Sequence, residues 1–153
     1  MTIEDDIAFL QRVPALSILG REALRILAIG AENRQVREGV SLFSEGEDAD
    51  GGYVVQEGSF ELAARENEKL DPVVVGPGAL LGEIALITQT KRPVSAVALE
   101  PSSVMRIPRQ LFMKMLESDP TAASRMRDSL AARVHQTAGE FSRVRSALAP
   151  ARK

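Results

Sequence analysis

The sequence predicts a mainly β protein with flanking helices: a double-stranded β-helix (jelly-roll) barrel with N-terminal helices and a long C-terminal helix. Two observations predict this class. Short apolar segments separated by turn residues recur between residues 34 and 108, a pattern that favours a closed β-structure. On both sides of them, apolar residues recur at helical spacing. We therefore expect one domain over residues 1–153, with helices in 3–31, the β-roll in 34–108 and C-terminal helices in 109–148.

The first thirty residues predict two helices. Ile7 and Leu10 belong to the first, which should end before Pro14 because the residue preceding a proline disfavours the α conformation. After Gly20, apolar residues return at helical spacing, with two isoleucines widening the apolar face. The residues of this second helix are Leu24, Ile26, Leu27, Ala28, Ile29 and Ala31.

The middle of the chain predicts short strands. Their apolar residues are Val36, Val40, Leu42, Tyr53–Val55, Phe60–Leu62, Val73–Val75, Val94–Ala98 and Val104–Ile107. Turn residues separate them, and we assign the glycines of this region to turns, Gly82 excepted. The separators are Gly39, Gly46, Gly51-Gly52, Gly58, Asn67, Asp71-Pro72 and Gly76-Pro77-Gly78.

After Pro108 the pattern returns to helix. Leu111, Phe112, Met115 and Leu116 form one apolar face, and Asp119-Pro120 is a typical helix start, with Asp as N-cap and Pro in the first turn. The apolar seam that follows has the 4, 3, 4, 3, 4 spacing of a heptad and predicts a helix that pairs in a homodimer. Its residues are Leu130, Val134, Thr137, Phe141, Val144 and Leu148.

The composition excludes several functions. Apolar content of 44% and charged content of 26% are ordinary for a soluble globular protein. There is no cysteine, His135 is the single histidine, and no serine has a histidine–carboxylate pair. We therefore expect neither a metal site nor an enzyme. The acidic N-terminus lacks the features of a signal peptide, and no stretch is long enough to span a membrane, so we expect a cytoplasmic protein.

Charge is unevenly distributed along the chain. Residues 1–100 hold 9 Lys/Arg and 17 Asp/Glu, a net charge of −8, whereas residues 101–153 hold 10 and 4, a net charge of +6. A basic C-terminal helix can form a nucleic-acid or acidic-partner surface. A solvated helix face is the commoner origin of such a pattern, and we prefer that interpretation here.

The most informative segment is Gly82 to Ser95. Gly76-Pro77-Gly78 forces a tight turn, so the chain should reach Glu83 from a strand. Glu83 follows a glycine and opens a short apolar turn, and Arg92 follows nine residues later. The first amides of such a turn can bind an anion, Arg92 offers a planar donor pair suited to phosphate, and Glu83 can accept hydrogen bonds from hydroxyls. By residue types alone, a Gly-Glu turn beside an unrelated surface arginine is the simpler interpretation.

Wider motifs change that interpretation. Leu81–Leu86, followed by Arg92–Ala96, resembles the phosphate-binding cassette of the cyclic nucleotide-binding domain family, which includes Crp/Fnr-type regulators. Phe43–Asp50 with Tyr53–Gly58, and Val104–Arg109 with Phe112, resemble two further segments of this family. The resemblance runs from about Leu10 to about Leu148. It implies a regulatory domain that senses cAMP or cGMP, with no other cofactor.

The resemblance also implies roles for single residues. Glu83 would hold the ribose 2′-hydroxyl, and Arg92 would pair with the cyclic phosphate. Backbone amides around Gly82, Ile84 and Ala85 would assist Arg92. The base would lie toward the C-terminal helix, where Arg133 and Thr137 are the candidates.

Pro93 departs from the pattern of the family. The residue at this position often donates its amide to the phosphate, and proline has no amide hydrogen. Ser95 could compensate in part, or its side chain could face the barrel wall. Two alternatives therefore remain beside the sensor: a nucleotide-blind dimeric adaptor, and the sensor part of a transcription regulator. The chain ends at Lys153, where the DNA-binding domain of Crp/Fnr-type regulators would follow, so we expect no DNA binding by this chain alone.

Overall fold

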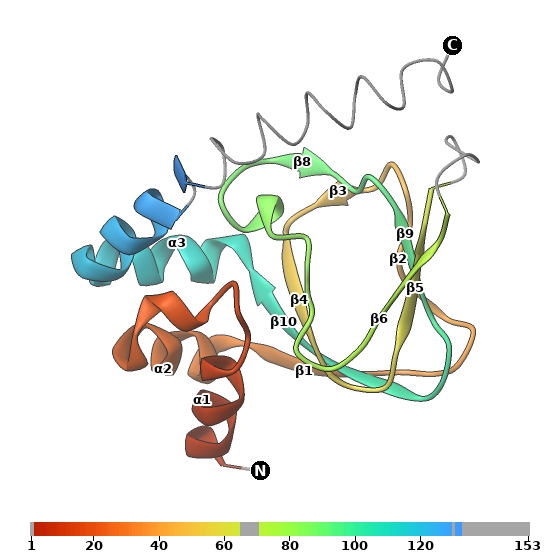
Figure 1. The fold of residues 1–153 in the computed structure, drawn as a ribbon, viewed down its shortest axis with the longest axis horizontal. Coiled ribbons are helices and arrows are strands. Elements are labelled where there is room, and N and C mark those ends of the chain that lie inside the picture. Colours follow the sequence, from red (N-terminus) through yellow and green to blue (C-terminus); the bar gives the residue numbers. More distant parts are fainter. Residues whose placement is uncertain (1, 65–70, 130, 133–153) are drawn as a thin grey trace.

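The computed structural model describes residues 2–64, 71–129 and 131–132, and it has a helical side and a β side (Figure 1). The helices lie together on one side: α1 (Ile3–Gln11), the 3-10 turn η1 (Ser17–Leu19), α2 (Arg21–Gly30) and α3 (Arg109–Ser118). The strands form the other side. The predicted class, mainly β with flanking helices, is confirmed.

Local signals account for where the helices begin. At the start of α1, Thr2 Oγ1 accepts a hydrogen bond from the Asp5 amide and Asp5 Oδ2 accepts one from the Thr2 amide, both at 3.1 Å, which is a capping box. A further helix begins at Pro120, and Asp119 Oδ1 accepts from the Ala122 amide at 3.0 Å. The predicted N-cap at Asp119 is therefore confirmed.

The strands form two antiparallel four-stranded sheets and one strand pair. The first sheet has the order β1 (Glu32–Val36), β10 (Ser102–Pro108), β4 (Gly51–Glu57) and β7 (Leu80–Leu81). The second has the order β2 (Ser41–Phe43), β9 (Ser95–Ala98), β5 (Phe60–Ala63) and β6 (Val73–Val75). β3 (Asp48–Ala49) pairs with β8 (Thr90–Lys91) in a separate two-stranded sheet.

The first sheet is the middle layer of the molecule. Along β4, Val54 packs into the core shared with the helices, whereas Tyr53 and Val55 pack into the core between the two sheets. Alternate residues of a strand point to opposite faces, so both faces of β4 are buried, and its apolar residues form a continuous run. The interior of the roll is thus a second core, separate from the helical one.

The structure corrects three details of the sequence prediction. The β region begins at Glu32 rather than residue 34, and the two-residue strands β3 and β8 were not expected. Gly51-Gly52 lies inside β4 rather than in a turn. A Cβ on Gly51 would collide with the Ile107 carbonyl oxygen of β10, so this glycine permits two strands to approach closely.

Candidate functional site

A short turn carries the predicted phosphate-binding cassette. β7 delivers the chain to Gly82, which has a φ of +82°, and the 3-10 turn η2 (Ile84–Leu86) follows. The predicted single turn after a strand is confirmed. The Ala85 amide donates to the Gly82 carbonyl and the Leu86 amide to the Glu83 carbonyl, both at 3.1 Å. The Ala85 amide, one of the expected phosphate donors, is therefore already engaged inside the turn.

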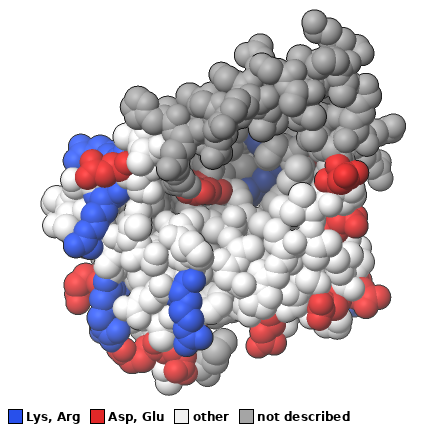
Figure 2. All heavy atoms as spheres, viewed as in Figure 1, with Lys and Arg blue, Asp and Glu red and all other residues white. Residues whose placement is uncertain are grey.

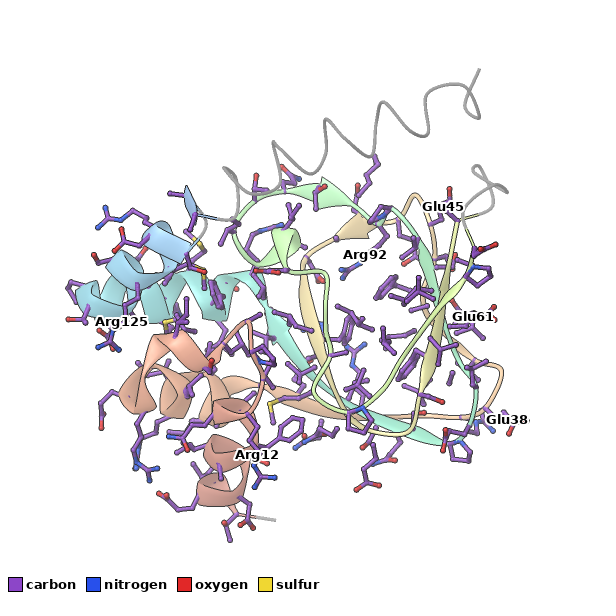
Figure 3. All side chains as sticks on the ribbon, viewed as in Figure 1. Arg12, Glu38, Glu45, Glu61, Arg92 and Arg125 are labelled. Atoms are coloured by element: carbon purple, nitrogen blue, oxygen red, sulfur yellow. The ribbon has the colours of Figure 1, made fainter. Side chains whose placement is uncertain are left out.

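Arg92 lies directly after β8, and hydrogen bonds of its backbone to the loop before β3 fix its position. Its amide donates to the Glu47 carbonyl and its carbonyl accepts from the Gly46 amide, both at 2.8 Å. The side chain points into the roll and is only 4% exposed (Figure 3). Its guanidinium carbon lies 4.4 Å from the centre of the Phe43 ring and 5.6 Å from that of Tyr53, both within the range of a cation–π interaction.

The guanidinium of Arg92 lacks a carboxylate partner within the described parts of the chain. Its Nη1 atom is buried and has no hydrogen-bond acceptor among those residues, and none of their carboxylates forms a salt bridge with it. Burial lowers the pKa of Arg92, and the neighbouring Tyr53, Asp50 and Glu47 offset this only in part. An arginine stays protonated in proteins even so. The roll therefore holds a buried positive charge with an unused donor.

Gly82 faces this donor. A Cβ at position 82 would collide with Arg92 Nη1 and would lie 3.2 Å from the Gly51 carbonyl oxygen. The positive φ of Gly82 disfavours other residues as well. Gly82 and Arg92, ten positions apart in the sequence, thus meet as the cassette resemblance implies.

Glu83 faces the helical side of the turn. It lines a narrow, mainly apolar cleft with Leu16, Phe112 and Met126, and its Oε1 atom is buried. Of the next two predicted residues, Ala85 is buried and Ile84 is 63% exposed. Glu83 therefore borders the helical core, whereas the guanidinium of Arg92 lies inside the roll.

Pro93 and Ser95 lie on the outer surface of the second sheet. Ser95 alternates along β9 with Ala96 and Ala98, which are buried inside the roll. Ser95 Oγ accepts a hydrogen bond from the Glu45 amide at 2.8 Å, and both residues, with Pro93, line a groove of about 1000 Å³ that also meets Arg92. In Figure 3 the labelled Glu61 likewise lies on this outer side, opposite Arg92.

Two predicted base contacts, Arg133 and Thr137, lie outside the described residues, as do the heptad positions from Leu130 to Leu148.

Sequence reasoning missed the aromatic pair that contacts Arg92. Phe43 and Tyr53 are stacked with ring centres 5.9 Å apart. Both residues belong to the segments that resemble the family, so the sequence shows that two aromatic residues are present there. Only the fold shows that they contact Arg92.

The surface charge does not reproduce the charge of the site. On the face seen in Figure 2, Asp and Glu predominate over the strands, whereas both signs mix over the helices. An anion approaching the strand side would meet mainly negative charge there. On this face, the positive charge that could attract an anion is therefore that of the buried Arg92 guanidinium.

The described residues show no feature of two other kinds of site. No helix within residues 2–64, 71–129 and 131–132 is long and apolar enough to cross a lipid bilayer. The same residues contain no cluster of three or more His, Asp or Glu side chains that could hold a metal ion.

Comparisons with known proteins agree with this geometry. The model of the cyclic nucleotide-binding domain matches residues 33–119, which is more than half of the chain. The structure of a cyclic nucleotide-binding-like protein from Brucella abortus is 43% identical, with a TM-score of 0.64, and the match covers 74% of this chain and 98% of that one. The N-terminal domain of a transcriptional regulator from Streptomyces coelicolor is 26% identical, with a TM-score of 0.76 and coverage of 87% and 94%.

A curated relative places the same domain in a much longer protein. An uncharacterized NTE family protein of Mycobacterium bovis is 32% identical over 128 residues, which are 84% of this chain and 22% of the relative. The chain thus spans about a fifth of that protein. The family match, the jelly-roll fold and the meeting of Gly82 with Arg92 lead to one conclusion: this chain belongs to the cyclic nucleotide-binding domain family, and its fold is that of the Crp/Fnr-type domains.

Proposed function

We propose that this chain is a non-enzymatic sensor that binds a cyclic nucleotide, cAMP or cGMP, with Arg92 as the phosphate anchor. One observation carries the proposal: Arg92 is 4% exposed, and its Nη1 atom has no acceptor among the described residues and faces Gly82. A buried charge without a partner is costly, so such a site favours an anion that supplies the missing acceptor.

The charge of the site favours a cyclic phosphodiester over a phosphate monoester. Arg92 is one buried cation, whereas the neighbouring Lys91 pairs with Asp48 at 2.7 Å and Arg106 pairs with Glu32 and Asp50. A cyclic phosphodiester carries one negative charge, which a single guanidinium balances. A monoester carries nearly two and would leave charge uncompensated in a buried site. Glu83, next to Gly82 in the sequence, would accept a hydrogen bond from the ribose hydroxyl.

Titration of the purified protein tests the proposal. We expect heat of binding with cAMP or cGMP and much weaker binding of 5′-AMP. At a ligand concentration of 100 Kd the stabilisation is about 2.7 kcal/mol, which corresponds to a rise of roughly 5–11 °C in Tm for a chain of this size. The absence of both heat and thermal shift at millimolar cAMP and cGMP would reject it. The nucleotide-blind adaptor, which Pro93 favours, would then take its place.

We also propose that the protein is a cytoplasmic homodimer that pairs through the helix beginning at Pro120. The support is the heptad seam, whose apolar residues would otherwise form a long exposed stripe. Phe141→Glu should separate the dimer and leave the roll folded, since burial of such a side chain stabilises by roughly 1.5–3 kcal/mol in each protomer. Light scattering measures the mass. A wild-type mass of one chain at tens of micromolar contradicts the proposed dimer.

A further inference from the structure

Arg109, the first residue of α3, contacts the backbone carbonyls of the cassette turn with its side chain. Its Nη1 atom donates to the Thr88 carbonyl at 3.0 Å and to the Ala49 carbonyl at 3.1 Å, and the Ala85 carbonyl lies 3.5 Å away. Its backbone amide donates to the Asp50 carbonyl at 2.7 Å. One residue thus joins the start of α3 to β3 and to the end of the cassette turn.

Two of the three carbonyls that Arg109 contacts, those of Ala85 and Thr88, belong to the cassette turn and the residues that directly follow it. The Ile87 and Thr88 amides both donate to the Ile84 carbonyl at 3.1 Å, which closes the turn. Carbonyls at the end of a helical turn have no later amide of that turn to accept from, and a cationic side chain can satisfy them. Arg109 therefore satisfies backbone groups that the turn itself leaves exposed.

Apolar packing connects the same two elements. Leu86 of η2 is buried in the helical core with Phe112 of α3, and both line the narrow cleft that contains Glu83. The cassette turn is consequently attached to α3 by Arg109 on its polar side and by Leu86 on its apolar side. A displacement of the turn must either move α3 or break these contacts.

We propose that Arg109 is a positioning residue: it holds the cassette turn in the conformation that presents Gly82 and Glu83 to ligand, and it couples that turn to α3. The proposal deepens the sensor function and rests on it. Arg106 provides a matched control. It lies three residues earlier on β10 and makes two side-chain ion pairs, with Glu32 at 2.9 Å and Asp50 at 2.6 Å, and no hydrogen bond joins it to the described residues of the cassette.

Hydrogen exchange tests the positioning role without any ligand. In Arg109→Gln we expect the amides of Leu86, Ile87 and Thr88 to exchange about ten-fold faster or more than in the wild type, because the end of the turn opens more often. In Arg106→Gln the same amides should keep the wild-type rate. If Arg109→Gln does not fold, Arg109→Lys replaces it, with a smaller increase in the same amides.

Calorimetry with cAMP and cGMP tests the consequence for binding. We expect Arg109→Gln to weaken affinity about ten-fold, which corresponds to the loss of one charge-assisted hydrogen bond. Arg109→Lys should give an intermediate loss of affinity. Arg106→Gln should stay within about two-fold of the wild type. Equal exchange rates or equal affinity losses in the two Gln variants would overturn the role of Arg109. If the wild type binds neither nucleotide, the sensor function fails, and the exchange rates alone decide whether Arg109 holds the turn.

Discussion

Two arginines of the roll, Arg92 directly after β8 and Arg106 on β10, show how differently one side chain can be used. Arg106 bonds two carboxylates, Glu32 and Asp50; burial alone would lower its pKa, but these partners outweigh burial and raise it. Arg92 is more deeply buried, has aromatic rings in place of carboxylates, and its pKa is lowered. The first arginine is satisfied by the fold. The fold fixes the position of the second, but its Nη1 atom has no hydrogen-bond acceptor among the described residues.

The aromatic rings explain how Arg92 stays in place without an acid. A cation–π contact restrains the guanidinium at one face and leaves its edge, where the N–H groups lie, open for an acceptor. A carboxylate in the same position would occupy that edge and compete with an anionic ligand. The partners of the two arginines therefore distinguish the structural role of Arg106 from the proposed ligand-binding role of Arg92.

The largest effect should come from filling the space beside Arg92. Gly82→Ala adds a Cβ that collides with Arg92 Nη1, in a backbone conformation with φ +82° that costs an alanine about 1–2 kcal/mol. We expect a loss of stability greater than this backbone cost and a drop in nucleotide affinity of at least about ten-fold, since sites tolerate displacements of only about 0.5 Å. Thermal unfolding and calorimetry provide the two measurements.

Gly39→Ala is the matched control for that substitution. Gly39 has almost the same φ, +81°, and an added Cβ would meet nothing within 4 Å. It should therefore show the backbone cost alone and an unchanged affinity. Equal losses of stability and affinity in the two variants would mean that the contact between positions 82 and 92 is unimportant.

A smaller effect should follow from removing the aromatic restraint. Phe43→Leu keeps an apolar side chain but eliminates one cation–π contact, worth about 0.5–2 kcal/mol, so affinity should fall roughly two- to thirty-fold. Phe60→Leu is the control, because Phe60 is equally part of the core of the roll and has no contact of this kind with Arg92. If both variants lose affinity to the same extent, general packing rather than the position of Arg92 determines binding.

The sequence predicted the fold class, the cassette turn and the helix start at Asp119 because each depends on local signals: strand periodicity, a glycine before a turn, and a capping side chain. It missed the strands β3 and β8, since two residues are too short to show any periodicity. It also assigned Gly51-Gly52 to a turn, because the close approach of β10 that requires Gly51 is a tertiary feature.

The sequence predicted some residues of the candidate site but not the contacts between them. Gly82 and Arg92 were found by motif, whereas the contacts of Arg92 with Phe43 and Tyr53, and of Arg109 with the turn, join segments that are distant in sequence. No local pattern reports such pairs. Ser95 illustrates the limit: the alternation along β9 places it outside the roll, bonded to the Glu45 amide, but only the assembled sheets define which face is outside.

The smallest effect is expected at Pro93. This residue is exposed on the outer groove and has no amide hydrogen to offer a phosphate. Pro93→Ala restores that donor, so affinity for cAMP or cGMP should rise by up to about ten-fold, the value of a neutral hydrogen bond of roughly 0.5–1.5 kcal/mol. Calorimetry on a folded variant checks it. Unchanged or weaker binding would show that the loop is already arranged around the proline.

The most direct test of the contrast between the two arginines is the affinity of Arg92→Ala beside that of Arg106→Ala. Hydrogen bonds to charged groups are worth about 1.5–3 kcal/mol, so Arg92→Ala should weaken cAMP or cGMP binding roughly ten- to a hundred-fold. Arg106→Ala should leave affinity within about two-fold and reduce stability by no more than about 1 kcal/mol, because its partners are largely exposed. An Arg92→Ala variant that is folded and binds nucleotide as tightly as the wild type would contradict the account.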